Sequence, residues 1–197
     1  MTIYADDRRF TDYIHKFLAI PLIYQALDWI KEDVPKEIIE ALDLKSGIDY
    51  ILKDIEGNIK TVQERFRDQK YQSYNDFTLR YRRDYNMHDE RKESEFFKID
   101  AEYMVYGITN GNKNHLDSVS DFIKFAVIDL KLLFQYINEG FIRLDSSIKT
   151  CQVISNLLYA PINHNVDYSS SFVAFDVKML HELFPYTGII MLQKGFF

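Results

Sequence analysis

The stretch GIDYILKDIEGNIKTVQERFR, residues 47–67, decides the fold that the sequence predicts. Residues 47–53 are rich in β-branched and aromatic side chains. In residues 59–68, Thr61, Gln63, Arg65 and Arg67 alternate with Val62, Glu64 and Phe66. Both patterns are typical of β-strands, in which successive side chains point to opposite faces of a sheet. The residues DIEG at 54–57 form a turn between them. The stretch therefore predicts a β-hairpin.

The turn chemistry predicts the register of this hairpin. Asp54 at the first turn position and Gly57 at the fourth fit a type I turn that is closed by a left-handed glycine. Such a three-residue loop, at 55–57, pairs Asp54 with Asn58.

This register decides which side chains meet across the hairpin. With the three-residue loop, Asp49 lies opposite Gln63, and Arg65 shares the face of Gln63 because alternate strand residues point the same way. A two-residue loop at 56–57 would instead place Asp49 opposite Glu64. The three-residue loop is the favoured interpretation, and Glu64 is the alternative partner.

Helices and further strands are predicted on both sides of the hairpin. Apolar residues recur mostly three to five positions apart from about Asp6 to Asp33, which predicts a helix that Pro21 kinks or divides. The remaining elements up to residue 109 are predicted as a short helix at 36–42, a strand at 76–83, a charged helix at 89–98 and a buried strand at 101–109. The predicted order is therefore αβββαβ.

The rest of the chain is expected to extend this core. Ser118 with Asp121 resembles a capping box, and the apolar spacing after it predicts a long amphipathic helix that ends at Gly140. The last third predicts a strand at 171–175, a helix at 177–184 with Asp176 as its N-cap, and a final apolar segment at 188–193. No repeat or linker interrupts the sequence, so we predict a single domain over 1–197, with a core at about 6–139 and a C-terminal helical and strand extension at 140–197.

Composition limits the classes of protein that this chain can be. Its 197 residues are 47% hydrophobic, which is enough for a substantial core. The apolar runs are too short to span a bilayer, and the mixed charges at 6–9 do not resemble a signal peptide. The single cysteine, Cys151, cannot form an internal disulfide, and no Cys/His group has zinc-site spacing. We therefore expect an intracellular, cytoplasmic protein without a membrane partner.

The charge of the chain is unevenly distributed. The net charge of −6 argues against a protein that coats nucleic acid without specificity. Residues 60–92, however, hold nine basic and six acidic side chains. This excess predicts a local basic patch, with Arg67, Lys70, Arg80 and Arg82 as candidate phosphate contacts. A solvated, charged strand face is the alternative interpretation of the same residues.

The hairpin carries residue types that suit phosphodiester chemistry. Hydrolysis with a metal requires oxygen ligands that hold the ion near a phosphate, and a cation that positions water or stabilises developing charge. Asp49 and Gln63 supply the oxygens across the two strands, and Arg65 supplies the cation. Glu64 is the alternative ligand, because a carboxylate binds a metal better than a neutral amide does. The competing interpretation is an ordinary polar strand face in which Asp49 caps a turn or pairs with Arg65.

This pattern, GID at 47–49 followed by VQER at 62–65, resembles the PD-(D/E)xK nuclease superfamily, whose core has the same αβββαβ order. The resemblance covers about residues 6–109. It implies a restriction endonuclease-like α/β (α+β) fold, with a mixed central sheet flanked by helices. It also implies that Asp49 is the principal ligand of Mg²⁺ or Mn²⁺, that Gln63 is the second ligand, and that Arg65 stands at the usual lysine position. Since arginine cannot accept a proton, catalysis would require Lys60, Lys70 or water activated by the metal alone.

Two functions follow as expectations. The first is a metal-dependent nuclease that hydrolyses DNA phosphodiester bonds. The second is a noncatalytic nucleic-acid- or protein-binding module on a degenerate nuclease-like fold, which the arginine at the lysine position favours. DNA is the expected partner, and a free edge strand would allow two copies to form a homodimer.

Overall fold

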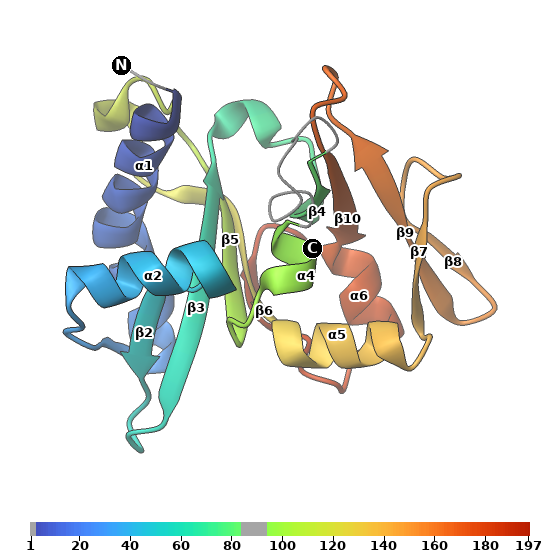
Figure 1. The fold of residues 1–197 in the computed structure, drawn as a ribbon, viewed down its shortest axis with the longest axis horizontal. Helices are drawn as coiled ribbons and strands as arrows, with labels where there is room; N and C mark the ends of the chain where they lie inside the picture. The colour runs from blue at the N-terminus through green and yellow to red at the C-terminus, as the bar shows by residue number, and fades with distance from the viewer. Residues whose placement is uncertain (1–2, 84–93) are drawn as a thin grey trace.

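The computed structural model describes residues 3–83 and 94–197, which form a mixed α+β fold with two sheets. The central sheet has the strand order β1-β2-β3-β5-β6-β11, and the second sheet has the order β4-β10-β9-β7. Figure 1 shows the N-terminal helices beside the central sheet and the second sheet on the opposite side of it. The described helices are not long and apolar enough to cross a membrane.

The N-terminal helix was predicted over Asp6–Asp33, and most of that range is helical. An α-helix, α1 (Ile3–Ile14), continues as a π-helix, η1 (His15–Tyr24), and a short 3-10 turn, η2 (Gln25–Leu27). Pro21 lies inside the π-helical segment, where it supplies no backbone N–H. The chain then leaves the helix and forms the edge strand β1 (Ile30–Lys31).

The predicted hairpin and its register are both confirmed. Helix α2 (Lys36–Ser46) leads into β2 (Tyr50–Lys53) and β3 (Ile59–Arg67). Tyr50 pairs with Val62, and Asp54 N donates to Asn58 O over 3.1 Å, as the three-residue loop requires. Gly57 has φ +84°, the left-handed conformation that this turn requires. Asp54 Oδ1 also accepts from Asn58 N at 2.8 Å, so the aspartate side chain closes the loop.

The long helix predicted between Ser118 and Gly140 is wrong over its first half. Residues Phe122–Asp129 form a strand, β6, which pairs with β5 (Tyr103–Thr109) on one side and with β11 (Ile190–Lys194) on the other. Only Leu130–Asn138 is helical, as α5, and its N-cap is Asp129, whose side chain accepts from Leu132 N. The confirmed strand β5 runs parallel to β3, so the central sheet is mixed.

The third strand predicted for the core belongs to the second sheet. Strand β4 (Asp76–Arg82) pairs with β10 (Ser171–Asp176) and not with β3. Beyond β10 lie β9 (Leu157–His164), β7 (Ile142–Asp145) and β8 (Gln152–Ile154), which the sequence did not reveal. The predicted strand and helix at 171–184 are confirmed as β10 and α6 (Val177–Leu183), with Asp176 as the N-cap. The predicted helix at 89–98 lies partly outside the described residues, and its described part is α4 (Glu95–Lys98).

Two hydrophobic cores cover the two faces of the central sheet. On one face, side chains of α1 and η1, such as Ile14 and Ile23, pack with Val62 and Phe66 of β3. On the other face, the second sheet packs through side chains such as Phe77. Because strand side chains alternate, Glu64 faces the helices, whereas Gln63, Arg65 and Arg67 face the space between the sheets.

Candidate functional site: a cleft at the free edge of β3

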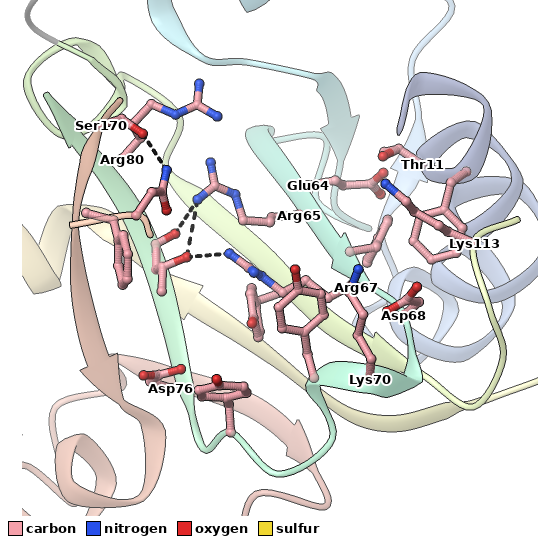
Figure 2. Close-up of a pocket in the computed structure, with 18 of the residues that line it drawn as sticks. Thr11, Glu64, Arg65, Arg67, Asp68, Lys70, Asp76, Arg80, Lys113 and Ser170 are labelled. Carbon is pink, nitrogen blue, oxygen red and sulfur yellow. Dashed lines mark hydrogen bonds between the residues drawn. The ribbon is translucent and has the colours of Figure 1, made fainter. Parts of the chain in front are cut away.

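A cleft of about 640 Å³ lies where the end of β3 meets the second sheet (Figure 2). It forms because β2 pairs only with residues 59–62 of β3, so within the described ranges the following residues have no partner strand on that side. The 3-10 turn η3 (Gln69–Tyr71) and the loop after β5 complete one wall, and β4 with the β9–β10 connection forms the other. The charged side chains that line it are Glu64, Arg65, Arg67, Asp68, Lys70, Asp76, Arg80 and Lys113.

Basic side chains dominate the wall between the two sheets. Arg65 Nη1 donates to the carbonyl oxygen of Thr78 at 2.6 Å, and Arg67 Nη2 donates to the hydroxyl of Thr78 at 3.0 Å. Arg67 also lies over the ring of Tyr71, 4.6 Å from its centroid. The pKa of the Arg80 guanidinium is lowered, first by burial and then by the positive charge of Arg65 and other arginines. Burial is the larger cause of the lowered pKa, and the neighbouring arginines add to it.

Glu95 connects three parts of the site. Its carboxylate accepts from Arg65 Nη2 at 2.5 and 2.6 Å and from Gln63 Nε2 at 2.6 Å. It also accepts from the backbone N–H of Arg80 at 2.7 Å. The Glu95 side chain is only 7% exposed and that of Arg65 is 21% exposed, so this is a largely buried ion pair that holds α4 against β3 and β4. The side chain at the expected lysine position therefore pairs with Glu95 rather than with Asp49.

Glu64 faces away from Gln63 and contacts the N-terminal helices. Its Oε1 accepts from the Tyr24 hydroxyl at 2.5 Å and lies 2.8 Å from His15 Nδ1. Burial, together with the charge of Glu64, holds the pKa of Tyr24 well above its usual range. The His15 ring stacks on Tyr50, with 3.7 Å between centroids. Glu64 Oε2 is buried and has no hydrogen-bond partner among the residues that the structure describes.

Asp49 stands at the entrance to β2, one residue before the Tyr50–Val62 pair at which the ladder ends, and its N–H donates to Val62 O at 2.9 Å. Its Oδ2 accepts from the backbone N–H of Glu64 at 2.7 Å, which caps the point where β2 stops covering β3. Burial raises the pKa of Asp49 to about 7, and the negative charges of Asp43 and Glu64 act in the same direction.

These positions do not fit a magnesium site as they stand. Asp49 is directed at the backbone of β3, Gln63 at Glu95, and Glu64 at His15 on the opposite face of the sheet. In the described ranges, no three Asp, Glu, His or Cys side chains lie close enough to hold a metal ion. Mg²⁺ binds through convergent oxygen ligands in near-octahedral geometry. The oxygen atoms of Asp49, Gln63 and Glu64 therefore do not converge on one point in this structure.

The other predicted phosphate contacts divide into two groups. Arg67, Lys70 and Arg80 line the cleft, whereas Arg82 lies outside the lining, near the rings of Tyr81 and Phe97. Lys60, a candidate for the missing lysine, pairs instead with Asp54 at the hairpin turn, at 3.1 Å.

Sequence reasoning missed three charged residues of the cleft, Asp68, Asp76 and Lys113. Asp68 and Asp76 were visible only as charges in the segment around β3 and β4. Lys113 lies in NGNKN at 110–114, directly after the buried strand β5. A loop rich in glycine and asparagine that follows a buried strand is a signal that could have pointed to it.

Comparison of the chain with protein-family models, with curated proteins and with solved structures gives no match. The function of the cleft must therefore be argued from its own chemistry. The resemblance to the PD-(D/E)xK nucleases stays a prediction.

Proposed function

We propose that the chain is a noncatalytic binding module that takes single-stranded nucleic acid into the cleft at the edge of β3. The observation that carries this proposal is the lining of the cleft. Five basic side chains (Arg65, Arg67, Lys70, Arg80 and Lys113) converge on it, against three acidic ones (Glu64, Asp68 and Asp76). Elsewhere the chain is acidic, so the cleft is where a polyanion would be attracted.

Arginine is well suited to bind phosphate at this position. Its planar guanidinium offers several donors and can hold two phosphate oxygens at once. Arg67 Nε is buried and, among the described residues, has no hydrogen-bond partner. A phosphate group in the cleft would supply that acceptor. Arg65, by contrast, is already neutralised by Glu95, so we assign it to holding the wall in place.

The dimensions of the cleft favour a single strand over a duplex. A volume of about 640 Å³ is typical of a site for a small ligand, and it accommodates a nucleotide or two. A duplex could place a base there only by flipping it out of the stack, at a cost of a few kcal/mol. Tyr71 and Tyr74, whose ring centroids are 6.1 Å apart, also line the cleft and offer aromatic surfaces for bases.

DNA cleavage is the second candidate function, and the confirmed register favours it. The register puts Asp49 next to the last pair of the ladder, beside the stretch of β3 that holds Gln63 and Arg65, as the nuclease resemblance implies. Gln63 Oε1 is buried and lacks a hydrogen-bond partner in the described part of the chain, so it has an acceptor to offer. Cleavage through a metal would nevertheless require Asp49 and Gln63 to turn toward a common point.

Fluorescence anisotropy with a labelled 12-nucleotide single strand and the matching duplex tests the proposal. We expect the single strand to bind more tightly, and Arg67→Gln to weaken its binding about tenfold while lowering the salt dependence by about one phosphate contact. The control is Arg143→Gln, which removes the same charge from an exposed side chain outside the cleft lining and should bind as the unchanged protein does.

Two results would refute the binding proposal. One is the absence of binding at low salt by protein shown to be folded. The other is an equal loss of affinity in the Arg67 and Arg143 variants. Incubation of the same strands with Mg²⁺ or Mn²⁺ tests the second candidate, which requires cleavage that Asp49→Ala abolishes.

A further inference from the structure

The cleft has a second, acidic end, and this end is built differently from the basic wall. Glu64 and Asp68 lie there, 7% and 5% exposed as whole residues, close to Thr11 of α1 and to Lys113 (Figure 2), and the Glu64 side chain itself has no exposed surface. Glu64 Oε2 and Asp68 Oδ1 are both buried, and neither has a hydrogen-bond partner within the described residues. A buried acceptor without a donor is costly, so two of them lining one cleft point to a ligand that brings donors.

The neighbours of Glu64 fix which of its oxygens is available. The Tyr24 hydroxyl and His15 Nδ1 both lie within 2.8 Å of Oε1. These two contacts fix the orientation of the carboxylate and leave Oε2 as the acceptor without a partner. Because the Glu64 side chain is fully buried, a base must displace side chains at this end of the cleft to reach Oε2, where it meets an acceptor that is already oriented and shielded from water. A hydrogen-bond donor is strongly favoured over an acceptor at such a position.

The alternation of β3 separates the two ends of the cleft. Glu64 and Asp68 are four residues apart and share the face toward the helices, whereas Arg65 and Arg67 lie on the opposite face. The pairing of β2 with β3 ends at the Tyr50–Val62 pair, so the edge of β3 after Val62 is open. The cleft therefore reaches both faces of the sheet. A nucleotide lying across this edge can place its phosphate at Arg67 and its base at Glu64.

We propose that the acidic end selects bases that carry an exocyclic amino group. This inference rests on the proposed binding of single strands. Cytosine and adenine present an N–H₂ donor where thymine and uracil present a carbonyl acceptor. A carboxylate attracts the amino group and repels the carbonyl oxygen. The site therefore prefers cytosine to uracil, two bases of almost the same size and stacking surface.

Anisotropy titrations with labelled (dC)12 and (dU)12 test this preference. A hydrogen bond between an amino group and a buried carboxylate predicts about tenfold tighter binding of (dC)12. In Glu64→Gln, the amide oxygen can keep the contacts to Tyr24 and His15 while its NH₂ group replaces Oε2. A donor then stands where an acceptor stood, so the preference should reverse toward (dU)12, whereas Glu182→Gln, at an exposed acid outside the cleft, should leave it unchanged.

A second variant keeps the test decisive if Glu64→Gln does not fold. Asp68→Asn changes the other unpaired acceptor and should reduce the preference for (dC)12 without weakening (dU)12. Equal affinity of the unchanged protein for the two strands would overturn the inference while leaving the binding proposal intact. A preference for (dC)12 that survives in every folded cleft variant would also overturn it, whereas failure to bind either strand would refute the binding proposal itself.

Discussion

Replacing Asp49 with asparagine should remove a pH dependence of stability that this carboxyl group imposes on the fold. Burial raises the pKa of Asp49 from 3.8 to about 7 in the folded protein, despite the hydrogen bond from Glu64 N. Asparagine keeps an oxygen that can accept this hydrogen bond, but it cannot ionise. The two proteins therefore differ mainly in the cost of burying a negative charge beside Asp43 and Glu64.

The sign of the effect follows from the direction of the shift. The unfolded chain releases the Asp49 proton above about pH 3.8, whereas the folded chain holds it until about pH 7. Stability contributed by the protonated carboxyl is thus fully present at low pH and is lost as pH rises from about 4 to about 7. Between pH 5 and pH 8, the difference in proton binding integrates to about 2–3 kcal/mol of lost stability.

Urea denaturation at pH 5 and pH 8, followed through the fluorescence of the buried Trp29, measures this difference. The stability of Asp49→Asn relative to the unchanged protein should be about 2–3 kcal/mol more favourable at pH 8 than at pH 5. Other titrating groups occur in both proteins, so their contributions largely cancel in this comparison. A relative stability that is the same at both pH values would refute the assignment of Asp49 as a partly buried carboxyl with a raised pKa.

Three further substitutions test how the fold supports the cleft, each by urea denaturation. Arg65→Met should lower the free energy of unfolding by about 2–4 kcal/mol, because Glu95 would stay buried without its cation. Adding Glu95→Gln should restore part of this loss. An Arg65→Met variant as stable as the unchanged protein would contradict the role of this pair. Gly107→Ala should lower the free energy of unfolding by about 1–3 kcal/mol, since the added Cβ atom would lie 2.5 Å from the ring of Phe122. Unchanged stability would mean that this ring can move away at no cost. Asp129→Ala should lower the free energy of unfolding by about 1 kcal/mol, because it removes the N-cap of α5. An unchanged free energy of unfolding would show that this cap contributes little.

The hairpin could be predicted from the sequence because its determinants are local. Asp54 and Gly57 specify the turn, and the turn specifies every pair up to Tyr50 and Val62. The same locality explains why Asp176 was identified as an N-cap. Where one or two neighbouring residues fix the backbone, pattern and structure agree.

The errors arose where pairing partners are distant in the chain. Residues 122–129 are apolar on both faces because the sheet is covered by helices on one side and by the second sheet on the other. Such a run has no alternation that distinguishes a strand from a buried helix. Likewise, β4 looks like the next strand of the core, yet it pairs with β10, almost a hundred residues later. Propensity identified β4 as a strand but held no information about its partner.

The candidate site shows the same division between local and distant information. Alternation along β3 correctly separates Glu64 from Gln63 and Arg65, but it does not say which layer will cover each face. In the structure, helices with polar side chains at His15 and Tyr24 meet Glu64, and α4 brings Glu95 to Gln63 and Arg65. Each expected ligand residue therefore has at least one partner, although Gln63 Oε1 has none among the described residues. Of the buried atoms without a partner in the described part of the chain, three belong to residues that line the cleft: Glu64 Oε2, Arg67 Nε and Asp68 Oδ1. Their positions at opposite ends of one cleft support the proposed binding of a nucleotide strand.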